Sequence, residues 1–222
     1  MDPLVTAAGL TFAYPNGKVL FEDVSIVAYA GTLTCVVGRS GIGKSTLLYC
    51  LAGVLRSAGE IKLAGQALST SASQRASLRL KNCGFIFQRG ELLPELTILE
   101  NVALPFQLTG NSRKSAHEAA AKSLDELSIY DCRDRKPNEI SGGQAQRASV
   151  ARALIHQPPV ILADEPTASL DPVSRDRVLV ALRAALEKGA AVICATHDPA
   201  LVDIADACLD LGDTSRAVRS TR

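Results

Sequence analysis

The sequence predicts an α/β fold whose core is a mostly parallel β-sheet with helices on both faces. Two observations lead to this prediction: short apolar runs recur along the chain, and helical stretches separate them. A polar or glycine-rich turn follows each run directly. Because the carboxyl ends of parallel strands meet at one edge of a sheet, these turns should form a ligand site there. The apolar runs are Leu33–Val37, Phe85–Phe87, Val160–Ala163 and Val192–Ala195.

Composition narrows the class of protein further. With 222 residues, 47% of them hydrophobic, the chain can form one large domain, or a core with an inserted subdomain. The formal net charge of +1 provides no field for recruiting nucleic acid, and we expect no nucleic-acid partner. The uncharged run Ser25–Gly38 is too short to span a bilayer and is interpreted as two strands around a turn. We see no signal-peptide pattern and expect a soluble, cytoplasmic chain. Six scattered cysteines favour reduced thiols over a disulfide or zinc framework.

Capping signals place several helices. Asp171 is a natural N-cap before Pro172, and Gly189 ends the helix that follows. Ser141 and Gln144 form an S-x-x-Q capping box, which opens a second helix. Both helices therefore begin at turns that the sequence itself specifies.

The stretch between the second and third apolar runs is predicted to be mostly helical. Its alanine-rich part, Ser112–Leu127, forms a helix in which Glu118 and Lys122 are spaced to pair at i,i+4. We therefore expect one domain over 1–222, with a core at about 1–88 and 157–222 and a helical insertion at about 89–156. An antiparallel β-region is expected near the N-terminus.

A phosphate-binding motif, G-x-x-x-x-G-K-[ST], lies between the first apolar run and the predicted helix Thr46–Leu55. Its glycines let successive backbone N–H groups point at phosphate oxygens, and the helix N-terminus adds positive potential. Lys44 is expected to bridge the β- and γ-phosphates of a bound nucleotide, and Ser45 to give Mg²⁺ a hydroxyl ligand. The alternative is a glycine-rich turn that matches the motif by chance. The predicted strand before the motif and the predicted helix after it both disfavour this alternative. The motif consists of Gly38, Arg39, Ser40, Gly41, Ile42, Gly43, Lys44, Ser45 and Thr46.

Two carboxylates follow the third apolar run. Asp164 suits the Mg²⁺ site, acting directly or through a coordinated water. Glu165 suits a general base that orients and deprotonates the attacking water. The alternative is that both acids lie on a solvated loop without a role in chemistry. The presence of a phosphate-binding motif in the same chain makes this alternative less favoured. Together the motifs predict a P-loop NTPase core.

The order of these motifs resembles the ABC ATPase family along nearly the whole chain. The most specific feature is Ile140–Gln144, which is similar to the family's signature sequence, with Ile140 where leucine is usual. Gln146–Arg147 and Ala151–Leu154 continue the match. Physically this is another anion site, a capped helix N-terminus after two glycines. The resemblance implies that it faces the γ-phosphate bound by a partner subunit, through Ser141, Gly142, Gly143 and Gln144.

Other site residues follow one by one from the same resemblance. Gln88 looks like the Q-loop glutamine, whose amide reaches Mg²⁺ and links the site to the insertion. His197 resembles the switch histidine that contacts the γ-phosphate, and Ser169–Asp171 resembles the D-loop that crosses the dimer interface. Tyr14 resembles the aromatic that stacks on adenine, but it could equally pack the core. The remaining histidines, His117 and His156, are expected at the surface.

Within the family, the segment Glu91–Pro105 is most similar to the lipoprotein-release and macrolide-efflux type of exporter. This resemblance implies a homodimer that forms on ATP and Mg²⁺ and drives a separate membrane permease from the cytoplasmic face of the membrane. It also favours export of a lipophilic or amphiphilic cargo, such as a lipoprotein, macrolide, peptide or haem. The apolar stretch Leu92–Ile98 either packs the insertion or borders a groove for a permease helix.

Two other functions remain as alternatives. A soluble ABC-type ATPase of DNA repair or translation would carry a long coiled coil, zinc hooks or a second cassette, and none is present in this sequence. A P-loop kinase or GTPase would lack the signature sequence, and a GTPase would carry an N-K-x-D motif, which is absent.

Overall fold

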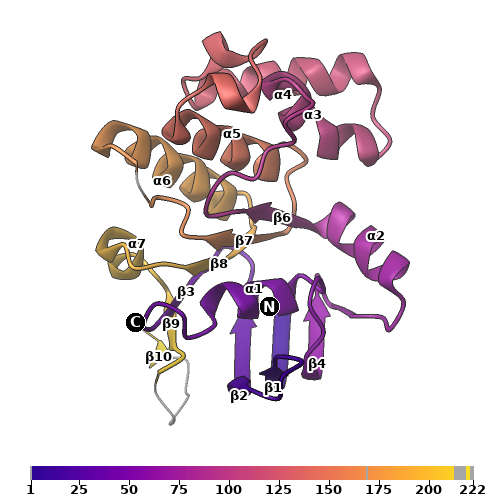
Figure 1. Ribbon diagram of the computed structural model, residues 1–222, viewed down its shortest axis with the longest axis vertical. Coiled ribbons are helices and arrows are strands. Elements are labelled where there is room, and N and C mark those ends of the chain that lie inside the picture. Colours follow the sequence, from indigo (N-terminus) through magenta and orange to yellow (C-terminus); the bar gives the residue numbers. More distant parts are fainter. Residues whose placement is uncertain (1, 169, 213–218, 221–222) are drawn as a thin grey trace.

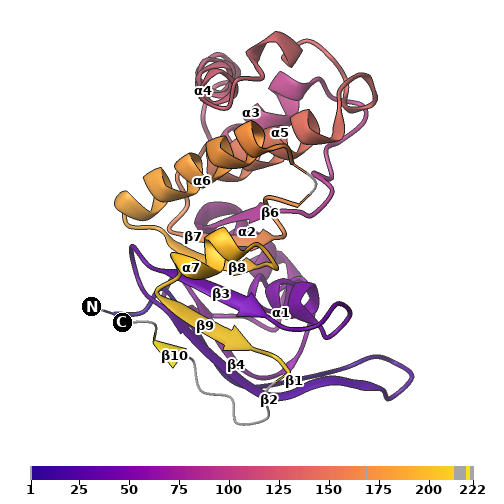
Figure 2. The ribbon, with the colours of Figure 1, turned by 90° about the vertical axis from the view of Figure 1, so that its left-hand side faces the viewer.

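The computed structural model describes residues 2–168, 170–212 and 219–220, which form two sheets and a group of helices (Figures 1 and 2). The first sheet is antiparallel, with strand order β2-β1-β4-β5. This sheet confirms the antiparallel region expected near the N-terminus. Its strands are β1 (Val5–Ala13), β2 (Val19–Ala28), β4 (Ala58–Leu63) and β5 (Gln66–Ala67).

The second sheet lies at the centre of the molecule and has the order β10-β9-β3-β8-β7-β6. Neighbours from β9 to β6 pair in parallel, and β10 pairs with β9 antiparallel. Every residue of β7 and β8 is buried, as expected where helices or another sheet cover both faces. The strands are β3 (Leu33–Val37), β6 (Cys83–Ile86), β7 (Val160–Asp164), β8 (Ala191–Ala195), β9 (Ala207–Asp210) and β10 (Arg219–Ser220).

Two groups of helices surround the central sheet. The first accompanies the core: α1 (Lys44–Leu51), α2 (Ala72–Asn82), α6 (Pro172–Glu187) and α7 (Pro199–Asp203). The second lies between β6 and β7: α3 (Ile98–Leu108), α4 (Arg113–Glu126) and α5 (Gly142–Leu154), with short 3-10 turns at Tyr130–Cys132 and Pro137–Glu139. The predicted helical character of this segment is thus confirmed, while the exact division into core and insertion stays a prediction.

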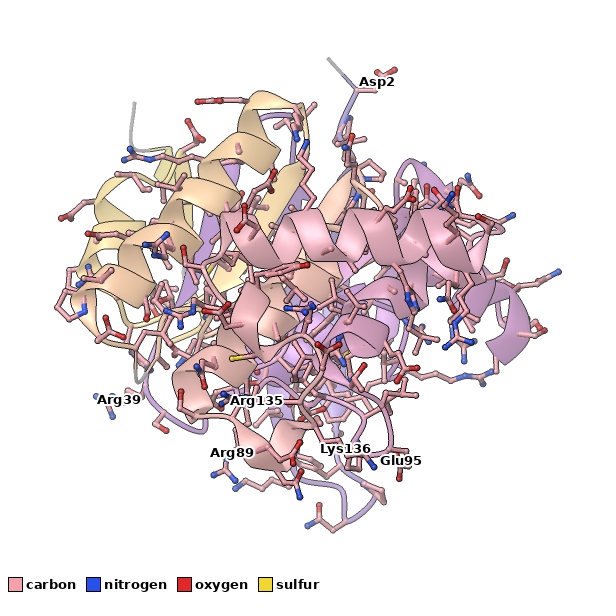
Figure 3. All side chains as sticks on the ribbon, turned by 90° about the horizontal axis from the view of Figure 1, so that it is seen from above. Asp2, Arg39, Arg89, Glu95, Arg135 and Lys136 are labelled. Atoms are coloured by element: carbon pink, nitrogen blue, oxygen red, sulfur yellow. The ribbon has the colours of Figure 1, made fainter. Side chains whose placement is uncertain are left out.

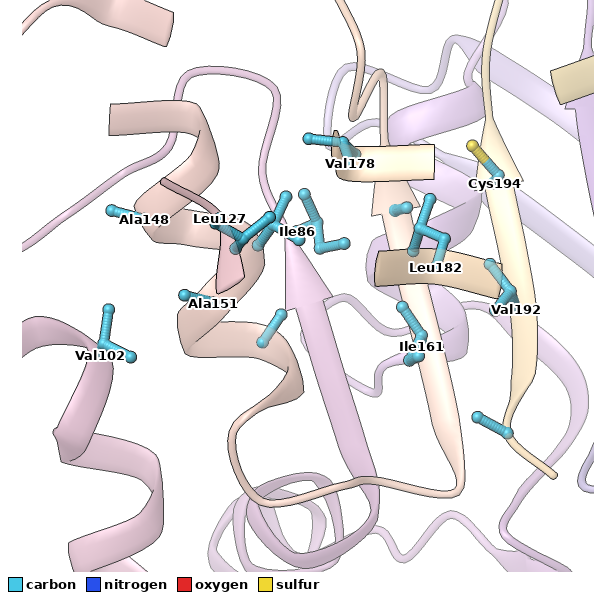
Figure 4. Packing of buried hydrophobic residues seen from close by; sticks show 14 of the residues in the cluster. Ile86, Val102, Leu127, Ala148, Ala151, Ile161, Val178, Leu182, Val192 and Cys194 are labelled. Atoms are coloured by element: carbon cyan, nitrogen blue, oxygen red, sulfur yellow. The ribbon is translucent and has the colours of Figure 1, made fainter. Parts of the chain in front are cut away.

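Alternating residues of the central strands face two apolar layers. Ile161 and Val192 point to a layer built with α5, α6 and the insertion helices (Figure 4). Leu162 and Ile193 point the other way, towards α1 and the antiparallel sheet. Full burial of such a side chain contributes about 1.5–3 kcal/mol. The two layers therefore hold the carboxyl edge of the sheet in place, and that edge carries the predicted site.

Several local expectations differ from the structure. Helix α1 ends at Leu51 rather than Leu55, because Gly53 takes a left-handed conformation (φ 65°) that closes a helix. Lys122 pairs with Glu126 at 4.0 Å rather than with Glu118. Both pairs have i,i+4 spacing, so the spacing itself did not choose between them.

The two histidines expected at the surface are half-buried instead. His117 Nε2 and both ring nitrogens of His156 are buried without a hydrogen-bond partner in the part of the chain described. Burial lowers the pKa of His156. The cysteines are free thiols, and five of the six are buried. Among the described residues, no helix is both long enough and apolar enough to cross a bilayer.

Candidate active site

The phosphate-binding motif forms a loop between β3 and α1. Gly38, Gly41 and Gly43 all have left-handed φ angles, of 138°, 77° and 114°. Gly43 is the N-cap of α1, and no side chain caps this helix. A Cβ on Gly43 would lie 2.9 Å from the side chain of Leu20, so both its φ angle and the space around it require glycine. The first-turn N–H groups of α1 therefore lack a side-chain acceptor, and an external anion can satisfy them.

The ammonium group of Lys44 is held by contacts within this loop. Its Nζ donates to the carbonyl oxygens of Gly38 at 3.0 Å and Arg39 at 3.4 Å. It also lies 2.8 Å from His197 Nε2. Lys44 and His197 are 153 residues apart in sequence, and they meet because β3 and β8 are neighbours in the sheet. The phosphate-binding loop and the loop after β8 thus meet at the Lys44 ammonium.

Glu165 lies on the other side of His197. Its Oε1 is 3.7 Å from His197 Nε2, and its Oε2 accepts the backbone N–H of His197 at 3.3 Å. The Glu165 backbone has a φ of 47°, a conformation that costs energy in a residue other than glycine and is often found at functional sites. The carboxylate is mostly buried, with 14% of its side chain exposed. It therefore has a fixed position beside His197.

Asp164 is the most buried acid of the site, at 4% exposure. Burial raises the pKa of its carboxyl group, although a hydrogen bond with Ser45 and the charge of Lys44 both act in the opposite direction. The opposing contacts are thus too weak to compensate for the lost hydration. A carboxylate and a hydroxyl together are ligands that suit Mg²⁺, and a divalent cation would supply the missing positive charge. The donor set fits the metal.

The signature turn begins α5 and lies apart from these groups. Ser141 Oγ accepts the backbone N–H of Gln144, and Gln144 Oε1 accepts that of Ser141, which confirms the predicted capping box. Ser141 and Gly142 are exposed. A Cβ on Gly142 would meet no described atom within 4 Å, and one on Gly143 would meet only Leu170, at 3.5 Å. This turn is open to solvent.

The signature turn and the phosphate-binding loop nevertheless lie on the same side of the molecule. Arg39 belongs to the loop, and Arg135 and Lys136 precede the signature turn (Figure 3). All three appear along one side, together with Arg89 of the segment after β6. A second molecule placed against this side could therefore meet both anion sites.

The remaining predicted residues lie around the site. Gln88 is exposed in the turn that follows β6. Asp171 is the N-cap of α6, accepting the N–H of Ser174 at 3.0 Å, while its neighbour Ser169 lies outside the described residues. Tyr14 is 42% exposed and contacts Phe12 edge-on at 5.4 Å, so the expectation that it could pack the core is only partly met.

Sequence reasoning assigned no role to Gln146 and Arg152, two residues of α5 that hold the site together. Gln146 is 3% exposed and donates to the carbonyl oxygens of Phe87 at 3.1 Å and Pro166 at 3.4 Å. Arg152 donates to the carbonyl oxygens of Gly90 and Glu91, both at 2.9 Å. A polar side chain on the core-facing side of a helix was the available signal for Gln146. Arg152 gave no comparable signal.

The arrangement of motifs matches a known family. Residues 21–168, about two thirds of the chain, match the family model described as "ABC transporter". This chain belongs to the ABC transporter family. Its fold is that of the solved ATP-binding cassettes, which confirms the predicted P-loop core.

Relatives within the ABC transporter family include two export proteins. The chain is 41% identical over 214 residues to the macrolide export ATP-binding/permease protein MacB of Rhodopseudomonas palustris (strain BisB18), covering 94% of this chain and 33% of that protein. It is 42% identical over 187 residues to the bacitracin export ATP-binding protein BceA of Halalkalibacterium halodurans, covering 83% of this chain and 74% of that protein. The chain spans about a third of the length of the MacB relatives it matches. The predicted similarity to macrolide-efflux ATPases is confirmed.

Solved ABC cassettes have the same fold. A dimeric post-hydrolysis state of the ATP-binding cassette MJ0796, bound to ADP and Pi, superposes with a TM-score of 0.91 at 29% identity, covering 98% of this chain and 99% of that one. A second dimeric structure of MJ0796 gives a TM-score of 0.90 at 28% identity. These relatives favour a transporter cassette over a repair or translation ATPase.

Proposed function

We propose that this ABC cassette binds two ATP molecules between two copies of itself and hydrolyses them to drive a membrane permease. The observation that supports this most directly is the junction of Lys44, Glu165 and His197 at one sheet edge. In the proposed reaction, Glu165 takes a proton from water while the water oxygen attacks the γ-phosphorus. The bond from that phosphorus to the β-phosphate oxygen breaks, and ADP and phosphate leave.

The chain's own residues prepare this step. Lys44 would shift from the loop carbonyls to the β- and γ-phosphates, and the backbone N–H groups of the loop would bind the phosphate oxygens. His197, which lies 2.8 Å from the Lys44 ammonium, would contact the γ-phosphate. We assign Ser45, Asp164 and Gln88 to Mg²⁺, which supplies charge neutralisation on the phosphates when bound. Tyr14 would stack on the adenine.

The open signature turn supports the proposed dimer. Ser141 and Gly142 are exposed and Gly143 is half-buried. Arg135 and Lys136, which precede this turn, lie on the same side of the molecule as Arg39 of the phosphate-binding loop (Figure 3). Two copies related by a two-fold axis would place the signature turn of each against the ATP of the other. The dimeric cassettes among the structural neighbours support this arrangement. Asp171 would lie at the same interface.

We further propose that the insertion receives the permease, at the cytoplasmic face of the membrane. Leu93 is 42% exposed in the segment after Gln88, while the nearby Ile98 is fully buried. Asn101 holds this segment firmly: its Oδ1 accepts the N–H of Leu93 at 2.7 Å, and its Nδ2 donates to the carbonyl oxygens of Leu93 and Leu96. An exposed leucine on a rigid loop is suited to a helix-in-groove contact. The names of the relatives favour export as the direction.

Permease docking can be tested with Leu93→Asp. We expect basal ATP hydrolysis to persist while co-purification with the permease falls about tenfold, because a charge replaces an apolar contact. Val180→Asp is the matched control, since Val180 is also exposed, at 65%, but lies on α6 of the core. Normal permease binding by a folded Leu93→Asp protein would move the docking surface elsewhere.

The catalytic assignment can be tested with Glu165→Gln. The amide keeps the shape but cannot accept the proton, so hydrolysis should fall by roughly 10²–10⁴-fold. ATP binding should survive, and the protein should accumulate as an ATP-bound dimer on size exclusion. Wild-type turnover in this variant would remove Glu165 from the role of base.

A further inference from the structure

The loop that carries His197 is tied to helix α6 by an ion pair. Asp198 Oδ1 accepts a hydrogen bond from Arg175 Nη2 at 2.7 Å. The two side chains are 13% and 37% exposed, so the pair is shielded more than a typical surface pair. Arg175 lies near the start of α6, after the N-cap Asp171 and the residues Pro172–Ser174, and Asp198 is the residue that follows His197.

Asp198 also makes hydrogen bonds to other residues around it. Its Oδ2 accepts the hydroxyl of Thr167 at 2.8 Å, and its Oδ1 also accepts the N–H of Ala200 at 3.0 Å. Its own N–H donates to Thr196 Oγ1 at 2.9 Å. Thr167 lies two residues after Glu165 and is 6% exposed. The Asp198 carboxylate therefore joins the Glu165 loop, the His197 loop and α6 at a single point.

The same turn of α6 also contacts the signature helix. Ser174 Oγ accepts a hydrogen bond from Arg147 of α5 and donates to Asp171 Oδ2 at 2.5 Å. Ser174 and Arg175 are adjacent, so the first turn of α6 is fixed to α5 on one side and to the His197 loop on the other. A turn held in this way can act as a rigid support for the loop.

We propose that Arg175 is a positioning residue, which holds His197 in register with Glu165 through Asp198. This role rests on the proposed hydrolysis of ATP. His197 itself is half-exposed, with few contacts of its own beyond Lys44 and Glu165. Its placement therefore depends on the backbone at Asp198. A displacement of about 1 Å at a reacting centre can cost on the order of 10²-fold in rate.

The test uses the substitutions Arg175→Ala and Arg175→Lys, with Arg183→Ala as control. Arg183 is exposed on the same helix, and in the described part of the chain its side chain has no hydrogen-bond or ion-pair partner. We expect Arg175→Ala to lower kcat about tenfold or more while KM for ATP changes less than about twofold, since Arg175 does not touch the phosphate-binding loop. Arg175→Lys should restore most of kcat, and Arg183→Ala should match wild type.

A double-mutant cycle with Asp198→Asn decides whether Arg175 acts through Asp198. If it does, adding Arg175→Ala to Asp198→Asn should lower kcat little further. If the losses in kcat of Arg175→Ala and Asp198→Asn multiply in the double variant, Arg175 does not act through Asp198. That result, or an unchanged kcat in a folded Arg175→Ala protein, would overturn the role of Arg175 but leave the proposed function standing. Absence of hydrolysis by the wild-type protein would overturn the proposed function, and the role of Arg175 with it. Circular dichroism on each variant separates these outcomes from loss of fold.

Discussion

Two helices of this cassette, α1 and α5, begin at glycine-rich turns, and their N-termini are built differently. At α1, Gly43 is the N-cap and no side chain accepts from the first turn. At α5, Ser141 caps the helix and Gln144 returns the hydrogen bond. The first-turn N–H groups of α1 therefore depend on an external anion, whereas α5 satisfies one of its own.

Their surroundings differ as well. The α1 turn lies beside Lys44, which contacts His197, and beside the buried Asp164. The α5 turn is exposed, and Leu170 is the one described neighbour within 4 Å of the positions that Cβ atoms on Gly142 and Gly143 would take. In the proposed ATP site, the α1 turn has charged side chains beside it, whereas the α5 turn offers only exposed backbone donors. This contrast supports the proposal that each ATP site is assembled from two chains.

The strongest test of this comparison disables one turn in each of two chains. Lys44→Ala should abolish the α1 site, with a loss of about 10²-fold or more in hydrolysis, because the ammonium on the phosphates is removed. A mixed dimer with Ser141→Ala would place both defects in one composite site and leave the other intact. We expect partial recovery of ATP-driven dimerisation and hydrolysis when the two variants are mixed. No recovery would indicate sites complete within single chains.

A smaller effect on hydrolysis should show whether the α5 cap differs from a cap that only stabilises its helix. Helix α3 begins with a similar box, in which Thr97 Oγ1 accepts the N–H of Glu100 at 3.2 Å. Thr97→Ala and Ser141→Ala should each lower the free energy of unfolding by about 1 kcal/mol. Only Ser141→Ala should also lower hydrolysis, by about tenfold, the equivalent of one hydrogen bond to a charged group. Equal hydrolysis in both variants, measured beside their urea unfolding, would reduce the α5 box to a structural cap.

The smallest expected effect is on the thermal stability of the protein, and it comes from the buried carboxyl group of Asp164 beside α1. Because burial raises the pKa of Asp164, the folded protein binds this proton more tightly than the unfolded chain does. The contribution of the Asp164 carboxyl to the free energy of unfolding therefore falls as the pH rises from the pKa of an ordinary aspartate through the raised pKa of the folded state. Asp164→Asn should raise the Tm of the nucleotide-free protein at pH 7 by about 2–4 °C, the shift expected for ~1 kcal/mol in a chain of this size.

Two controls accompany the measurement on Asp164. The advantage of Asp164→Asn should shrink as the pH is lowered towards 4, where the wild-type carboxyl gains its proton. Asp176→Asn, at an exposed position of α6, should leave Tm within about 1 °C. A lower Tm for Asp164→Asn at neutral pH would show that the hydrogen bond with Ser45 outweighs the cost of burial.

The sequence by itself determined the elements whose signals are local. The caps at Asp171 and Ser141 were predicted because each depends on a backbone N–H within three residues. The four apolar runs lie in or overlap parallel strands, because short, mostly apolar runs separated by helices favour a sheet covered on both faces. The end of α1 was misplaced, since the apolar pattern runs past the glycine at which the helix stops.

Only the tertiary structure decided which distant groups meet. The bond from Gln146 to Phe87 joins residues 59 apart, and the bond from Arg175 to Asp198 joins residues 23 apart. Neither spacing has a periodic signal, because these contacts depend on the order of strands in the sheet and the packing of α5 and α6 across it. The burial of His156 was missed for the same reason. Local hydrogen bonds and periodicity are encoded in neighbouring residues, whereas long-range contacts exist only after the layers have packed.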